Sequence, residues 1–111
     1  MAQILCMIAV VERGKADKIV DKAKEAGAKG ATVFYGRGTG ASEVKRFLNI
    51  HIDSSKEIIM ILCEEGEYKP IRDAVVDAGR LKDPGTGVVF TLPIIDLIGL
   101  HHREEFDLSQ E

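Results

Sequence analysis

The chain has 111 residues, of which 45% are hydrophobic, 30% charged and 5% aromatic, and its formal net charge is −3. This length favours a single domain, and the apolar content excludes an intrinsically disordered chain. The acidic excess argues against nucleic acid as a partner, and no apolar run reaches the ~18 residues of a membrane-spanning helix. We therefore expect a globular domain that neither binds nucleic acid nor inserts into a membrane.

The first half of the chain reads as strand, helix and strand. Gln3 to Val11 is a continuous apolar run rich in β-branched residues, which favours a strand. The run has neither a basic start nor a small-residue cleavage site, so we expect no signal peptide and a cytoplasmic location. From Lys15 to Ala26 apolar residues recur at helical spacing, and Gly27 follows as a stop signal. Ala31 to Tyr35 predicts a second strand, and Gly36 to Gly40 a glycine-rich turn.

The second half repeats this order. After a polar stretch from Ala41 to Ser55, the apolar run Glu57 to Cys63 predicts a third strand. A second helix is expected from about Tyr68 to Ala78, with Gly79 ending it. Val88 to Leu92 predicts a fourth strand, which a proline then stops.

The order of these elements is strand, helix, strand, strand, helix, strand, and the two halves resemble each other at an offset of 52 positions. The matching residues are Ile19, Asp21, Ala26 and Gly27 in the first half and Ile71, Asp73, Ala78 and Gly79 in the second. A duplicated βαβ unit predicts an α+β, ferredoxin-like sandwich, which is a four-stranded antiparallel sheet with two helices on one face. This single domain would occupy residues 1–100, followed by a charged C-terminal tail at 101–111.

The strands predicted at Gln3–Val11 and Glu57–Cys63 are apolar on both faces. Helices can cover only one face of such a sheet, and a soluble monomer rarely exposes an apolar sheet. The sequence therefore predicts a homo-oligomer whose subunits cover the second face. The alternative is a cover made only by the apolar segment Ile94 to Leu100.

The residues that most often carry chemistry form no familiar pattern. Cys6 and Cys63 lie inside apolar runs, so we expect two buried free thiols. His51, His101 and His102 lack the spacing of a metal site, so we expect solvated histidines and no metal. No nucleophile or acid–base arrangement is visible, so we expect that the protein is not an enzyme and has no catalytic residues.

Two glycine segments and one long connection remain. Gly36–Gly40 and Pro84–Gly87 have the backbone freedom to bring amides close to an anion. Each alone reads as an ordinary turn, and only the pair suggests an anion site. The stretch Ala41–Ser55 is long for a connection between adjacent strands, and such loops are often functional. It is either an arm that packs on a neighbouring subunit or a partner-binding loop, whose contact tip would be Lys45, Arg46 and Phe47.

From Gln3 to Leu100 these residues resemble the PII signal-transduction proteins and their PII-like relatives. The segments that carry the resemblance are Lys15–Gly27, Gly30–Val33, Gly38–Gly40, Glu57–Cys63 and Gly85–Phe90. Residues 36–56 resemble the family's regulatory T-loop and residues 80–87 its B-loop. The resemblance implies a homotrimer that takes part in nitrogen regulation. It also implies a small effector, usually an adenine nucleotide, in each cleft between subunits, and a T-loop that acts on a membrane transporter or a metabolic enzyme.

The resemblance also implies a set of ligand-binding positions, with departures from the family pattern. These positions are Arg37, Gly38, Thr39, Gly40, Gly85, Thr86, Gly87, Val88, His101 and Arg103. Val88 stands where the family has a phosphate-binding lysine, while Gly99 and His101 stand where it has arginines. Ser42 replaces the glutamine at the base of the T-loop, and the segment has no tyrosine to modify. Fewer cations suit an effector with less charge, such as AMP, ADP or a cyclic nucleotide, rather than ATP.

Two other functions use the same fold. A CutA-like trimeric metal-tolerance protein would need the two cysteines, the histidines or carboxylates to converge on a metal. A small ferredoxin-like enzyme would need an acid–base or nucleophile pair in a cleft, and the sequence shows none.

Overall fold

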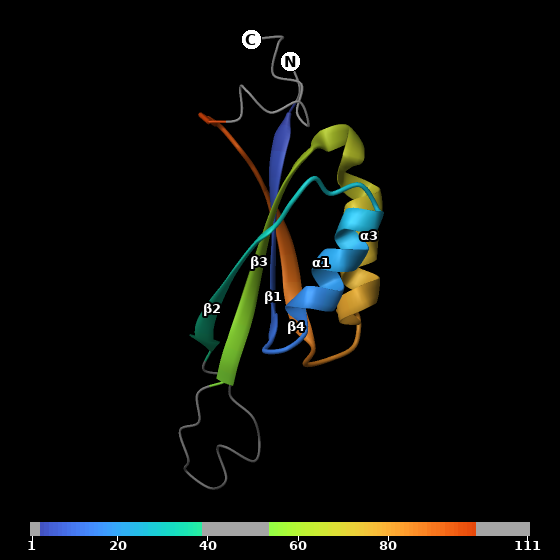
Figure 1. Ribbon diagram of the computed structural model, residues 1–111, viewed down its shortest axis with the longest axis vertical. Coiled ribbons are helices and arrows are strands. Elements are labelled where there is room, and N and C mark those ends of the chain that lie inside the picture. The colour runs from blue at the N-terminus through green and yellow to red at the C-terminus, as the bar shows by residue number, and fades with distance from the viewer. Residues whose placement is uncertain (1–2, 39–53, 100–111) are drawn as a thin grey trace, which may run out of the picture.

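A computed structural model of the chain describes residues 3–38 and 54–99 (Figure 1). The elements follow in the order β1 (Ile4–Glu12), α1 (Ala16–Glu25), β2 (Thr32–Gly38), β3 (Ser54–Glu64), a 3-10 turn η1 (Glu65–Glu67), α3 (Tyr68–Gly79) and β4 (Gly87–Pro93). The strands form one antiparallel sheet in the order β2-β3-β1-β4. The ferredoxin-like βαββαβ fold predicted from the sequence is therefore confirmed.

Both helices lie on one side of the sheet, as Figure 1 shows. Alternate residues of the two central strands point toward them, because successive side chains of a strand face opposite sides. This buried layer includes the following side chains: Met7, Ala9, Val11, Ile59, Ile61 and Cys63 from the sheet, and Ile19, Ala23, Ile71 and Val75 from the helices. The core is thus aliphatic, as the scarcity of aromatic residues requires.

The opposite face of the sheet is also apolar, but neither α1 nor α3 covers it. The register places Ile8 beside both Met60 of β3 and Phe90 of β4. Val88, Phe90 and Leu92 are 46–56% exposed there. The described part of the apolar segment that follows β4 does not cover this face of the sheet, because Ile95 is 99% exposed. The two-faced apolar sheet predicted from the sequence is therefore present, with one face open.

Two glycine predictions were wrong in detail. Gly36 to Gly38 is not a turn, because β2 continues through it and pairs with β3 as far as Ser54. The second helix ends with Gly79 as its last residue, and the left-handed position after it, where a glycine is usual, is occupied by Arg80 with φ of 54°. Gly79 serves packing instead, since a Cβ there would come within 3.1 Å of Ile19 Cδ1.

Both cysteines are buried free thiols, as predicted. Cys6 pairs with Leu62 and Leu5 pairs with Cys63, so the two thiols point to opposite faces of the sheet. No helix within residues 3–38 and 54–99 is long and apolar enough to cross a membrane.

Candidate functional site

The described parts of the two glycine segments singled out in the sequence lie at the same end of the sheet. In the register, Gly36 lies opposite Lys56, Lys56 lies opposite Glu12, and Val11 lies opposite Gly87. Strand β2 therefore ends at the same end of the sheet at which β4 begins, with β3 and β1 between them. The two glycine segments predicted to bind a ligand lie on the two outer strands at this one end of the sheet.

Lys56 occupies the centre of this sheet end. Its ammonium lies 2.6 Å from Oε1 of Glu12, and the side chain is 25% exposed. A Cβ at Gly38 would come within 2.8 Å of Lys56 Cε, and one at Gly36 within 3.0 Å of Ile58 Cδ1. The glycines of β2 therefore make room for the side chains of β3. Neither Lys56 nor Glu12 was among the predicted ligand-binding residues, because only the strand register brings them together.

The loop from residue 80 to 86, which leads into β4, is held by its own side chains. The Thr86 hydroxyl lies 2.7 Å from the carbonyl oxygen of Arg80 and 3.0 Å from that of Asp83, and it can donate its proton to either. The Arg80 guanidinium also pairs with Asp83 at 3.0 Å. A loop fixed in this way presents its backbone amides in a defined arrangement before any ligand arrives.

The glycines of this loop have different roles. Gly85 has a φ of 77° and open space around it, so its backbone conformation is what requires glycine. At Gly87 a Cβ would lie 2.5 Å from the carbonyl oxygen of Val10. Gly87 is therefore needed for the close packing of β4 on β1. The neighbouring Val88 is 56% exposed and opposes Val10 on the open face.

A buried carboxylate supports the site from the helix side. Glu57 is 7% exposed, and its Oε1 accepts hydrogen bonds from the amides of Gly14 at 2.7 Å and Ala16 at 2.9 Å. The Arg13 amide donates to the carbonyl oxygen of Ser55 at 3.3 Å, and the Arg13 guanidinium lies 5.9 Å from the centre of the Tyr35 ring. The turn between β1 and α1 is thereby tied to β2 and β3 where they border the 39–53 segment.

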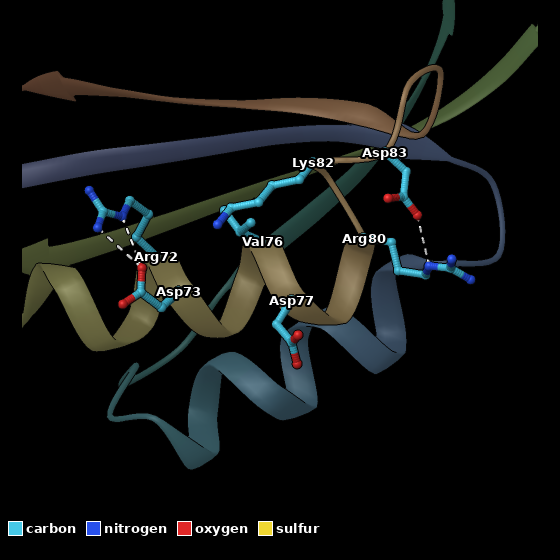
Figure 2. Close-up of a pocket in the computed structure, with 7 residues that line it drawn as sticks. All are labelled: Arg72, Asp73, Val76, Asp77, Arg80, Lys82 and Asp83. Carbon is cyan, nitrogen blue, oxygen red and sulfur yellow. Dashed lines mark hydrogen bonds and ion pairs between the residues drawn. The ribbon is translucent and has the colours of Figure 1, made fainter.

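A separate hollow of about 600 Å³ lies along α3 and the loop that follows it (Figure 2). It is lined by Arg72, Asp73, Val76, Asp77, Arg80, Lys82 and Asp83. Figure 2 shows its two arginines engaged by neighbouring aspartates, in ion pairs of 3.1 and 3.0 Å. Three cations face three carboxylates, so the hollow carries no net charge for an ionic ligand. Of the predicted ligand-binding residues that the structure describes, none lines it.

The described residues offer little for metal or thiol chemistry. Within 3–38 and 54–99, no three His, Cys, Asp or Glu side chains converge on a metal position. Burial raises the pKa of the Cys6 thiol, and it raises that of Cys63 to about 11, with the charge of Glu67 adding to the effect. Both thiols are therefore protonated at neutral pH, and thiolates are the forms that react or bind metal.

Several predicted positions lie outside the described residues. These are Thr39, Gly40, His51, His101, His102 and Arg103, and the predicted partner contacts Lys45, Arg46 and Phe47. Of the predicted ligand set, the structure places Arg37 and Gly38 at the end of β2, and Gly85 to Val88 at the start of β4.

The chain is similar to known proteins over most of its length. The family model for "Nitrogen regulatory protein P-II" matches residues 5–104. Among solved structures, Bacillus subtilis GlnK in complex with ATP has a TM-score of 0.66 and 17% identity, covering 83% of this chain and 82% of that chain. Arabidopsis thaliana PII bound to citrate has a TM-score of 0.68 and 19% identity, covering 91% of this chain and 86% of that chain. No curated protein sequence matches the chain.

Proposed function

Because the chain belongs to the nitrogen regulatory protein P-II family, we propose that it is a non-enzymatic signalling protein that binds a small anionic effector. The observation that carries this proposal is the position of the two glycine-bearing segments at the same end of the sheet, with Lys56 on a strand between them. We further propose that the effector is an adenine nucleotide, AMP, ADP or ATP, and that the protein takes part in nitrogen regulation.

Two features support an anionic effector at this end of the sheet. The loop from 80 to 86 is fixed by the Thr86 hydroxyl, so its amides need little further ordering on binding. Lys56 supplies a cation beside β2. The two structural neighbours were solved with ATP and with citrate, which are both anions.

The open apolar face supports a homotrimer. The apolar residues of this face include Ile8, Val10, Phe34, Ile58, Met60, Leu62, Val88, Phe90 and Leu92. A contiguous apolar surface of this kind marks a protein–protein interface rather than a solvated surface. Each cleft between subunits would then border the sheet end that holds Lys56 and the 80–86 loop. In the trimer, His101 and Arg103 would complete the site.

The relay would use the T-loop-like segment, residues 36–56. Its ends are the described strands β2 and β3, which Arg13 and Glu57 tie to the start of α1. An effector bound beside these strand ends would change the arrangement of the loop. The loop would then act through Lys45, Arg46 and Phe47 on a cytoplasmic partner, either a membrane transporter or a metabolic enzyme.

Calorimetric titration with ATP, ADP, AMP, cyclic nucleotides, 2-oxoglutarate and bicarbonate tests the proposed function. Binding of at least one adenine nucleotide at one site per chain is expected. Silence across the whole panel would refute effector sensing by this site. Metal analysis of the purified protein addresses the CutA-like alternative, which would be favoured by stoichiometric transition metal that survives dialysis.

A further inference from the structure

A close ion pair, Lys56–Glu12, lies inside the proposed effector site. Lys56 Nζ is 2.6 Å from Glu12 Oε1, a shorter separation than the 3.0–3.6 Å of the ion pairs Lys22–Glu25, Lys29–Glu67, Arg72–Asp73 and Arg80–Asp83. Both side chains project from the open face of the sheet, because the two residues pair directly and their neighbours Val11 and Glu57 are buried on the helix side. The cation best placed to meet an anionic effector is therefore already neutralised by a carboxylate of the same chain.

The position of Glu12 makes it a neighbour of both parts of the site. It follows Val11, which opposes Gly87, so Glu12 borders the residues at which the 80–86 loop enters β4. Through Lys56 it also borders Gly36 and Gly38 of β2. A negative charge at this point repels every further negative charge that an effector brings to the sheet end.

The pair is well suited to exchange partners. The Glu12 side chain is 41% exposed, and an ion pair with that much contact with water contributes only about 0–1 kcal/mol to stability. An effector anion can therefore displace the Glu12 carboxylate from Lys56 without unfolding the sheet end. The displaced carboxylate stays beside the ligand, so the cost grows with ligand charge.

Building on the proposed function, we infer that Glu12 determines the charge specificity of the effector site. By acting as an internal counter-ion for Lys56, it disfavours triphosphates and favours nucleotides that carry fewer charges. Lys56 is the group that an effector phosphate or carboxylate would contact, and Glu12 is the competitor that such a group displaces.

The test compares the affinities of AMP and ATP for the full chain and for two charge-matched variants. Glu12→Gln removes the competitor. Glu64→Gln removes one carboxylate from the other end of the same sheet face, where Glu64 opposes Ile4, and is the matched control. We take the Glu12 charge to lie roughly 6 Å from the ligand, at an effective dielectric constant between those of a protein surface and water. Removing this charge should then raise the affinity for ATP about tenfold. The affinity for AMP should rise less, and Glu64→Gln should change neither.

A double-mutant cycle with Lys56→Gln separates competition for Lys56 from general repulsion. The gain from Glu12→Gln should shrink by more than half when Lys56 is absent. An unchanged ratio of ATP to AMP affinity in Glu12→Gln, or an equal change in Glu64→Gln, would overturn the inference while leaving the proposed function intact. If neither the wild-type chain nor Glu12→Gln binds any nucleotide, the inference and the proposed function are both overturned.

Discussion

The Glu57 carboxylate and the Ala16 amide are joined by a hydrogen bond of 2.9 Å that caps the first helix across 41 positions of sequence. The residue at the ordinary cap position, Lys15, makes no side-chain capping bond. The same carboxylate oxygen also accepts from Gly14 at 2.7 Å. One buried acid on β3 thus serves the amides and the positive end of α1, which a local serine or aspartate would usually serve.

Replacing Glu57 should cost stability in an order set by hydrogen bonding. Glu57→Leu leaves the amides of Gly14 and Ala16 without an acceptor, so the free energy of unfolding should fall by about 2–3 kcal/mol. Glu57→Gln keeps an acceptor oxygen and should lose about 1 kcal/mol. Urea denaturation gives these values, and hydrogen exchange should show the Ala16 amide deprotected only in Glu57→Leu. Equal losses in the two variants would contradict the capping role.

The two glycines of the β4 entry should respond differently to alanine. Gly85→Ala adds only the strain of a positive φ in open space, or about 1 kcal/mol. Gly87→Ala forces a Cβ against the Val10 carbonyl oxygen and should lose at least about 3 kcal/mol. Thermal unfolding of both variants gives the comparison. A milder effect at Gly87 than at Gly85 would show that β4 does not pack on β1 as described.

The sequence alone was enough to predict the fold, because helical and strand periodicities and the 52-residue repeat all agree with one topology. It was not enough at Gly36 to Gly38, where glycine serves the Lys56 and Ile58 side chains rather than a turn. Likewise, the sequence predicts Glu57 only as a polar residue at the start of a strand. Its side chain is buried, because a hydrogen-bond partner comes from the start of α1. The Lys56–Glu12 contact depends on strand register, which no local pattern reveals.

The Thr86 hydroxyl should matter more for the effector than for the fold. Thr86→Val keeps the shape but removes the bonds to the Arg80 and Asp83 carbonyls. Because these bonds order the loop before binding, we expect nucleotide affinity to fall about 3–10-fold, equivalent to one lost hydrogen bond, with little change in Tm. Thr86→Ser keeps the hydroxyl and should bind like the wild type. Calorimetry measures the nucleotide affinities of the wild type, Thr86→Val and Thr86→Ser. Equal affinities would show that ordering of the 80–86 loop does not contribute to binding.

The Cys63 thiol should make stability depend on alkaline pH. Its pKa is raised from the ordinary value of 9.0 to about 11, chiefly by burial. Above pH 9 the unfolded chain releases a proton that the folded chain keeps, so this contribution is complete below pH 9. It is lost as the pH rises toward 11, up to about 3 kcal/mol. Urea denaturation at several pH values should show a shallower decline for Cys63→Ala than for the wild type. Parallel declines would contradict the assignment.

The open sheet face should control assembly. Phe90→Asp places a charge in the centre of the proposed interface, where it would be buried in every subunit, so the trimer should dissociate. Val76→Asp adds the same charge in the hollow outside α3 and should leave the assembly unchanged (Figure 2). Sedimentation velocity measures both. Retention of the wild-type mass by Phe90→Asp would show that this face is not the interface.

Native mass spectrometry of the full chain with AMP and with ATP tests the central claim most directly, because it reports subunit number and bound nucleotide together. The account predicts a particle three times the mass of the 12.2 kDa chain that binds up to three nucleotides. A 12.2 kDa monomer that binds neither nucleotide at millimolar concentration would contradict it.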